Sequence, residues 1–332
     1  MVVFCNCGID FGARLFMLYF VRKEFTEMNK LGLIRNKSKI NHIAKSAVGA
    51  AAKYLILASV GYIYLQPIIT MLLGSVMSPE DLANPTVKWW PTELCFTNYK
   101  EAYETLDFLK SFANSLLTSV FPMLFQTITA AFVGFGFARF EFPLKKMWMA
   151  ILVATFIIPS QVTLVPRYVL YYQYGIINTV LPAYLPSLFG QGIKSALFIL
   201  VFYQFFRTYP ISFDEAAELD GAGKITVFTK IAIPMGIPAI VVSLLFSFIW
   251  YWNETSQSNL YFGAKITTLP MRLQQFTAIF ESLYGAAEGS SGLNNAIIFA
   301  GTTLSILPVI ILYLVFQRQF VESIEKSGIT GE

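Results

Sequence analysis

The sequence predicts an all-α, polytopic membrane protein with six transmembrane helices. Hydrophobic residues make up 55% of the 332 residues and charged residues only 13%, and the mean hydropathy is +0.58. A soluble domain carries about 25% charged residues, so this chain has too little charge to cover a water-soluble particle of its length. The other two observations are six long apolar stretches and an uneven distribution of lysine and arginine between the segments that connect them.

Each apolar stretch approaches or exceeds the roughly 20 residues that a helix needs to cross the hydrocarbon core. In chain order, the expected spans are residues 53–77, 108–138, 147–168, 185–206, 239–261 and 295–316. Around them we expect an N-terminal region over 1–52, a transmembrane domain over 53–318 that includes a large loop at 208–238, and a C-terminal tail over 319–332.

Lysine and arginine indicate which loops face the cytoplasm. Seventeen of the 24 lie in the N-terminal region, in the loops after the second and fourth spans, and in the C-terminal tail, whereas six lie in the opposite loops. The positively charged side of a membrane protein is normally cytoplasmic. We therefore expect both termini inside a bacterial plasma (inner) membrane.

The first 27 residues do not resemble a signal peptide. Their apolar stretch, 11–21, is interrupted by Arg14 and is followed by no small-residue cleavage site. Met28 opens a plausible translation start. We interpret residues 1–27 as a start-site artefact, and the alternative is a genuine cytoplasmic tail.

Cysteine and histidine counts argue against a metal-dependent or histidine-dependent membrane enzyme. The cysteines are Cys5, Cys7 and Cys95, without metal-binding spacing, and the one histidine is His42. No nucleophile–base set is present, and the net charge of +4 is too small and scattered for nucleic acid. We expect no cofactor, no metal site and no catalytic residue.

Several residues within the spans are candidates for a translocation pathway, because polar groups at membrane depth usually face a bundle interior or a water-filled path. The candidates are Gln161, Lys194, Trp252, Asn253 and Glu254. At 1.5 Å per residue, Lys194 and Glu254 both lie roughly 20 Å from the cytoplasmic end of their spans. We expect these two residues to approach each other or to face one cavity.

The second span carries Ala130, Gly134 and Ala138 at a spacing of four residues. Small residues at this spacing form a stripe along one helix face and allow close contact with another helix. We expect this stripe to pack against a neighbouring span.

The loop at 208–238 is locally well specified. Ser212 and Glu215 have the spacing of a capping box at the start of a helix, and a short helix should end after Leu219 with Gly221 as its left-handed stop. A second amphipathic segment, 225–233, should end before Pro234. The residues alone leave two interpretations open, a rigid docking helix for another protein and an interfacial helix lying on lipid.

The same loop resembles the signature of permease subunits of ATP-binding-cassette importers. That signature is EAA, three residues, Gly, nine residues, Ile, one residue, an aliphatic residue and Pro. It is met without a gap by Glu215-Ala216-Ala217, Gly221, Ile231, Ile233 and Pro234. Further segments resemble the second permease of the maltose importer, namely 96–104, 136–146, 157–168, 250–255, 267–270 and 307–332. Leu144, Tyr203 and the Gly/Ser-rich loop 284–294 depart from that pattern.

The resemblance implies a type I importer permease fold and a function in carbohydrate uptake by alternating access. The helix at 215–219 would be the coupling helix that docks on an ATPase subunit. The residues implied in ATPase coupling are Ser212, Glu215, Ala216, Ala217, Leu219, Asp220, Gly221 and Pro234. The tail 328–332 would contact the ATPase dimer interface, and the loop 284–294 would reach the binding protein.

The implied partners are a second permease subunit, two ATPase subunits, an extracytoplasmic substrate-binding protein and membrane lipid. The chain has no phosphate-binding GxxxxGK[ST] loop, so we expect ATP hydrolysis in the partner. The alternative is a stand-alone secondary transporter or channel, in which Lys194 and Glu254 would form an ion relay. That alternative leaves the docking helix unexplained.

Overall fold

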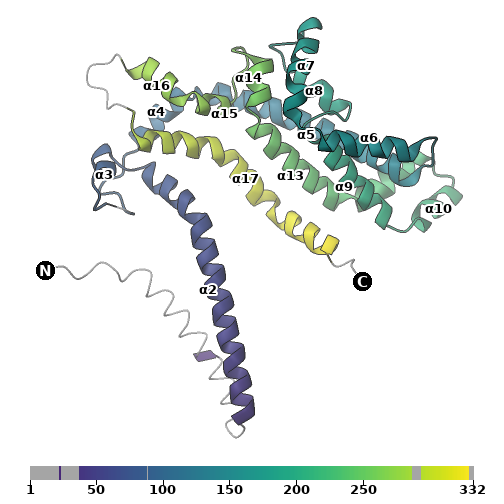
Figure 1. The fold of residues 1–332 in the computed structure, drawn as a ribbon, viewed down its shortest axis with the longest axis horizontal. Coiled ribbons are helices and arrows are strands. Elements are labelled where there is room, and N and C mark those ends of the chain that lie inside the picture. Colours follow the sequence, from purple (N-terminus) through teal and green to yellow (C-terminus); the bar gives the residue numbers. More distant parts are fainter. Residues whose placement is uncertain (1–21, 24–36, 88, 286–292, 329–332) are drawn as a thin grey trace. The chain divides into compact units, whose positions relative to one another are not determined.

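The computed structural model describes residues 22–23, 37–87, 89–285 and 293–328. They separate into two compact units, residues 1–69 and 70–332, which are considered individually. The expectations for residues 1–27, for the centre of the loop 284–294 and for the end of the tail fall largely outside the described residues. Every regular element described is a helix, so the all-α class is confirmed (Figure 1).

The helices are, in order, α2 (Lys37–Gly74), α3 (Pro79–Ala83), α4 (Thr97–Thr105), α5 (Phe108–Arg139), α6 (Lys145–Ile157), α7 (Ser160–Gln173), α8 (Leu181–Leu188), α9 (Ser195–Thr208), α10 (Ser212–Leu219), α11 (Lys224–Val227), a π-helical turn (Phe228–Ala232), α12 (Ile233–Met235), α13 (Ile237–Asn253), α14 (Ser256–Phe262), α15 (Leu269–Gln274), α16 (Phe276–Tyr284) and α17 (Asn295–Gly328). The expected boundaries at residues 52 and 318 fall inside α2 and α17.

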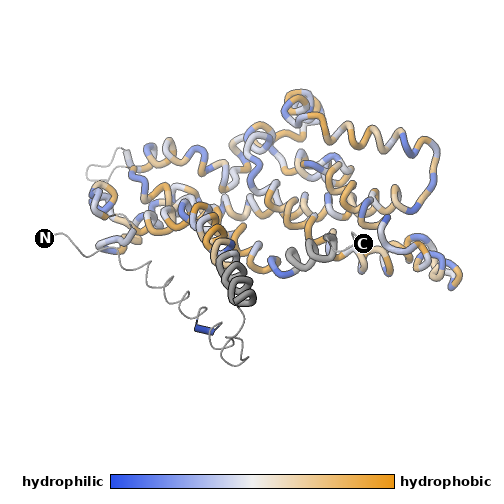
Figure 2. The backbone as a smooth tube through the Cα atoms, turned by 60° about the horizontal axis from the view of Figure 1, so that its bottom comes forward, coloured by the Kyte–Doolittle hydropathy of each residue, from blue (hydrophilic) through white to orange (hydrophobic). Residues whose placement is uncertain are grey.

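Among the described residues, three helices are long and apolar enough to cross a membrane without a break. They are the Gly49–Gly74 part of α2, α5, and the Asn295–Arg318 part of α17. The part of α2 whose side chains are described is mainly hydrophobic (Figure 2). These helices coincide with the first, second and sixth expected spans, because long apolar runs without internal breaks fix helices of this length.

The other three expected spans are not continuous helices. The third is bent by 97° between α6 and α7, at Ile158 and Pro159. The fourth, expected at 185–206, is interrupted between α8 and α9, and α9 is bent by 74° from α10. In the fifth, α13 ends at Asn253, and α12 and α13 are bent by 76°. If each bent pair counts as one span, the described residues hold six.

Local chemistry accounts for the first of these breaks, and backbone geometry marks the second. Proline lacks an N–H donor and disfavours helical geometry in the residue before it, and Ile158 is accordingly extended with ψ 122°. The segment between α8 and α9 contains Gly190 at φ +69° and Lys194 at φ +54°, a left-handed geometry that a helix does not accept. Both breaks lie within apolar stretches, so composition alone does not reveal them.

A core of aromatic residues joins α5, α9 and the segment that leads into α13. Phe135, Phe202 and Phe206 are buried here, and the Phe135 and Phe206 rings meet edge to face at 5.6 Å. The expected small-residue stripe lies in this contact, since Ala130 is buried and a Cβ at Gly134 would lie 2.6 Å from the Cβ of Phe202.

Gly134→Ala should separate α5 from α9 and lower the melting temperature of the purified protein. The new methyl group also meets backbone atoms, the Tyr203 nitrogen at 2.9 Å and the Ile199 oxygen at 3.0 Å, and overpacking of this kind typically costs about 1–3 kcal/mol. Gly136→Ala is the matched control, because a Cβ there has nothing within 4 Å. Equal melting temperatures for the two variants would contradict close α5–α9 packing.

A second core joins α4, α13, α16 and α17. Phe248, Trp252, Phe276 and Ile297 are buried in it. Within residues 70–332, α4 and α16 lie at one end of the bundle and α10 at the other (Figure 1). The two ends therefore present different elements to any partner.

Candidate functional site

Two of the helix breaks, together with the end of α13, border one cavity of about 640 Å³. One part of its wall is the end of α6, the start of α7 and the break between them. The rest is the segment 190–194, the start of α9, the end of α13 and the residues that follow it. Residues 190–194 are called the linker below. Backbone that leaves helical geometry at membrane depth is expected where it borders a cavity, and the α6–α7 break and the linker both do so.

A polar cluster that we call the clamp, Gln126, Tyr251, Ser195 and Ser247, fixes the linker. Gln126 on α5 is 0% exposed. Its Nε2 donates to the Ile193 carbonyl at 3.0 Å and to Ser247 Oγ at 2.9 Å, and its Oε1 accepts from Ser195 Oγ at 3.0 Å and from the Tyr251 hydroxyl at 2.9 Å. The Tyr251 oxygen in turn accepts from the Ile193 N–H at 3.1 Å. Both backbone groups of Ile193 are thus satisfied without a helix.

Gly192 leaves the room that the clamp needs. A Cβ at this position would lie 2.3 Å from Gln126 Oε1 and 2.3 Å from the Tyr251 hydroxyl oxygen. No larger residue fits unless one of these buried groups moves. Lys194, two residues after Gly192, has φ +54° at the N-cap of α9. Its ammonium lies 4.3 Å from the centre of the Trp250 ring.

Four of the five expected pathway residues line this cavity. They are Gln161, Lys194, Asn253 and Glu254. Lys194 and Glu254 therefore face one cavity, and no ion pair joins them in the described part of the chain. Trp252 does not line it: this side chain is 2% exposed and packs against Phe248 at 5.4 Å and Phe112 at 6.2 Å.

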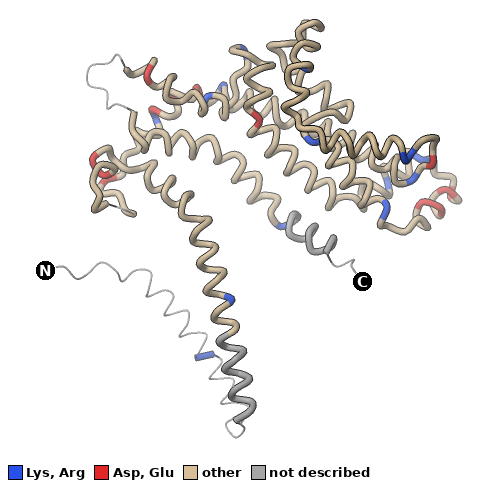
Figure 3. The backbone as a smooth tube through the Cα atoms, in the orientation of Figure 1, with Lys and Arg blue, Asp and Glu red and all other residues tan. Residues whose placement is uncertain are grey.

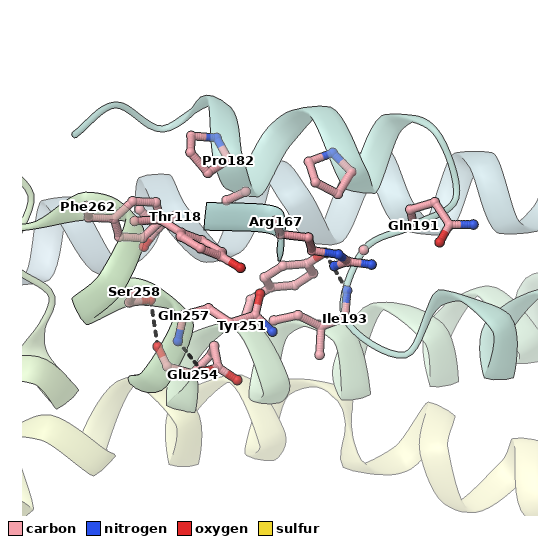
Figure 4. Close-up of a pocket in the computed structure, with 14 residues that line it drawn as sticks. Thr118, Arg167, Pro182, Gln191, Ile193, Tyr251, Glu254, Gln257, Ser258 and Phe262 are labelled. Carbon is pink, nitrogen blue, oxygen red and sulfur yellow. Dashed lines mark hydrogen bonds between the residues drawn. The ribbon is translucent and has the colours of Figure 1, made fainter. Parts of the chain in front are cut away.

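Sequence reasoning missed Arg167, which lines the cavity and also an adjoining recess of about 30 Å³ (Figure 4). Tyr251 and Glu254 line the same recess, which is large enough for a water molecule. Glu254 is held by the Gln257 N–H, which donates to its carboxylate at 2.8 Å. The signal for Arg167 was present, because it is a charged residue at the end of an apolar span.

The second site is α10, which a buried ion pair fixes to the end of α5. Arg139 Nε lies 3.0 Å from Asp214 Oδ2, and each side chain is 9% exposed. The Tyr209 hydroxyl donates to Asp214 Oδ1 at 2.9 Å, and Arg139 Nη2 donates to the Tyr209 carbonyl at 2.9 Å. Burial raises the pKa of Tyr209 to about 12, so its hydroxyl stays protonated as a donor at physiological pH. We call these three residues the anchor.

The end of α10 confirms the expected left-handed stop. Gly221 has φ +83°, the Ala222 N–H donates to the Ala217 carbonyl at 2.9 Å, and the Gly221 N–H donates to the Glu218 carbonyl at 3.0 Å. This pair of bonds is the Schellman arrangement, which satisfies the last carbonyls of a helix.

The expected capping box at the start of α10 is wrong. Ile211 is already in helical geometry, so Ser212 is the first residue of the helix and not its cap. The Asp214 and Glu215 N–H groups both donate to the Ile211 carbonyl, at 2.9 and 3.1 Å. The helical path after α11 also continues through Pro234 to Met235 and turns at Gly236, two residues later than expected.

The outward face of α10 combines apolar and acidic residues. Ser212, Phe213, Glu215, Ala216, Asp220 and Gly221 are exposed, and Leu219 is 90% exposed. Ala217 is half-buried against the aromatic core and does not share that face. Figure 3 shows the acidic residues gathered on α10, close to basic residues near the end of the bundle.

Comparison with known proteins identifies the family. The family model described as "Binding-protein-dependent transport system inner membrane component" matches residues 126–326, which include the clamp, the linker and α10. The chain belongs to this family.

Relatives of this inner membrane component include the melibiose/raffinose/stachyose import permease protein MelC of Bacillus subtilis, 26% identical over 83% of this chain and 95% of that protein. The osmoprotective compounds uptake permease protein GgtD of Synechocystis is 26% identical over 82% of this chain and 89% of that protein. The diacetylchitobiose uptake system permease protein NgcG of Streptomyces coelicolor is 25% identical over 83% and 88%.

The fold of the inner membrane component is similar to a chain in the crystal structure of a bacterial ABC transporter involved in the import of the acidic polysaccharide alginate. The TM-score is 0.72 at 21% sequence identity, over 83% of this chain and 98% of that chain. The expected permease class and type of fold are confirmed, and the chain is a permease subunit of a binding-protein-dependent transporter.

Proposed function

We propose that the chain is the permease subunit of an ATP-driven importer of sugars or oligosaccharides, and that a separate ATPase acts on it through α10. One observation carries the proposal: α10 presents apolar and acidic side chains to the outside while the Arg139–Asp214 pair fixes its other face to α5. An exposed apolar surface on a rigid element is typical of an interaction site. A helix lying on lipid would not need acidic residues on the same outward face.

The cargo is inferred from the relatives and from the cavity. The named relatives MelC and NgcG import sugars, and the cavity of about 640 Å³ has the size of a small-molecule pocket. Gln161 and Asn253 offer amide groups to it, and amides are suited to bonding sugar hydroxyls.

The proposed assembly contains a second permease, two ATPase subunits and an extracytoplasmic binding protein. The distribution of lysine and arginine supports a cytoplasmic position for α10 and for both termini. ATP-driven closure of the ATPases would move α10, shift the population of inward- and outward-facing states, and open the cavity to each side in turn. ATP hydrolysis belongs to the partner.

Removing residues 215–219 should abolish copurification of the ATPase and reduce sugar uptake to background. The single substitution Gly221→Pro should also abolish ATPase copurification and sugar uptake. Proline cannot adopt φ +83° and has no N–H to donate to Glu218. Gly223→Ala is the matched control, since its φ of −72° is accessible to alanine and a Cβ there meets nothing within 4 Å.

The same variants separate an importer from a stand-alone carrier. A carrier that used Lys194 and Glu254 as an ion relay should still transport when α10 is removed, provided that the protein folds. Near-normal uptake and ATPase assembly in Gly221→Pro would overturn the role proposed for α10.

A further inference from the structure

We propose that the cavity selects a carbohydrate that carries a carboxylate, such as a uronic acid unit, over its neutral counterpart. The inference rests on the proposed function as a sugar permease and names the chemistry of its cargo. It is carried by the charges that line the cavity, since two cations, Arg167 and Lys194, face one acid, Glu254.

The three charges are available to a ligand. In the part of the chain that the structure describes, none of them forms an ion pair. Glu254 is held by the backbone of Gln257, and Lys194 lies over the Trp250 ring. An excess of positive charge in a cavity with low-dielectric walls concentrates anions there.

The position of Lys194 adds to the positive potential. It stands at the N-cap of α9, a helix of 14 residues whose positive dipole end is at this terminus. Both the helix end and φ +54° disfavour a lysine, and the clamp on its neighbours Ile193 and Ser195 holds it there nonetheless. A carboxylate gains a charge–charge attraction from this arrangement that an uncharged ligand does not.

Arg167 and Glu254 suit the two kinds of group that such a ligand carries, its carboxylate and its hydroxyls. A guanidinium presents parallel N–H groups that match both oxygens of a carboxylate. A glutamate carboxylate accepts bonds from hydroxyls, which every sugar ring carries. Both side chains border the recess shown in Figure 4 as well as the main cavity, so one sugar unit can reach both.

Uptake by the complete importer in proteoliposomes tests the selectivity. The probes are matched disaccharides that differ only in a carboxylate or a hydroxymethyl group, in the galacturonic, glucuronic and mannuronic series. We expect the acidic member of at least one pair to be taken up about 10-fold faster. Arg167→Gln and Lys194→Asn should each reduce that preference about 10-fold. Asparagine is chosen because it tolerates positive φ, and Lys265→Gln, an exposed lysine outside the cavity, is the control.

Faster uptake of the neutral members, or a preference unchanged in both variants, would overturn the inference and leave sugar import standing. Uptake of neither member of any pair would also overturn the inference, whereas sugar import is tested separately by the removal of residues 215–219.

A second measurement does not depend on the cargo. In a chain with Cys5, Cys7 and Cys95 replaced by serine, Asn253→Cys places one thiol on the cavity wall. The measured quantity is the ratio of the rates at which an anionic and a cationic methanethiosulfonate modify this thiol. The ratio should be higher in this chain than in the same chain with Arg167→Gln and Lys194→Asn. We expect the ratio to fall about 10-fold with both changes and to stay constant with Lys265→Gln. A ratio that does not respond to the two changes would contradict the inference.

Discussion

Gly192→Val should abolish uptake and lower the melting temperature of the purified protein by more than any other single substitution in the linker. The side chain would have to enter space that Gln126 Oε1 and the Tyr251 oxygen already occupy, each 2.3 Å from the Cβ position. Either the clamp opens or the linker moves away from α5. Each buried polar group left without a partner costs about 1–3 kcal/mol, so the loss of two amounts to about 2–6 kcal/mol.

Two further variants separate collision from backbone strain. Gly190→Ala lies in the same linker at φ +69°, but a Cβ there would be no closer than 3.6 Å to its neighbours, so it measures strain alone. Tyr251→Phe removes one of the two oxygens that the new side chain meets. It should be destabilising alone but should partly rescue Gly192→Val, a non-additivity that only groups in contact show. Strict additivity, or normal uptake by Gly192→Val, would contradict the clamp.

The linker shows why hydropathy predicts where a membrane helix lies better than where it breaks. Residues 185–206 are apolar enough to suggest one span, yet the backbone unwinds because Gln126 and Tyr251 supply the hydrogen bonds that a helix would have made. These partners are 67 and 58 residues away in the chain. Gly221, by contrast, acts within its own turn, so its left-handed geometry could be predicted from local sequence.

The aromatic run at 250–252 illustrates a second limit. Successive residues on a helix point about 100° apart, so the three side chains have three different surroundings. Trp250 faces the cavity beneath Lys194, Tyr251 completes the clamp, and Trp252 is buried in the core. The sequence predicted polar and aromatic residues at this depth, but the rotation of α13 that decides among them depends on packing against α5 and α17.

Asp214→Ala should prevent the ATPase from associating with the permease although Asp214 does not belong to the exposed face of α10. It removes the anion that compensates Arg139, whose side chain is 9% exposed. Breaking a buried pair by removing one partner typically costs about 3–5 kcal/mol. We expect a lower melting temperature and at least a 10-fold loss of ATPase copurification, because α10 loses its fixed orientation.

Glu218→Ala is the matched control on the same helix. Glu218 pairs with Lys224, but the two side chains are 39% and 58% exposed, and exposed pairs contribute only about 0–1 kcal/mol. Its effect on the melting temperature should be correspondingly small.

The double variant Arg139→Met/Asp214→Leu distinguishes stability from orientation. Replacing both members of a buried pair with apolar residues is often neutral or stabilising, so the melting temperature should recover toward that of the unmodified protein. If the anchor orients α10, ATP-driven uptake should recover less than the melting temperature does, because the directional bonds from Tyr209 and Arg139 are gone. Full recovery of both would show that α10 needs only a buried contact at this position, and that the ion pair has no further part in coupling.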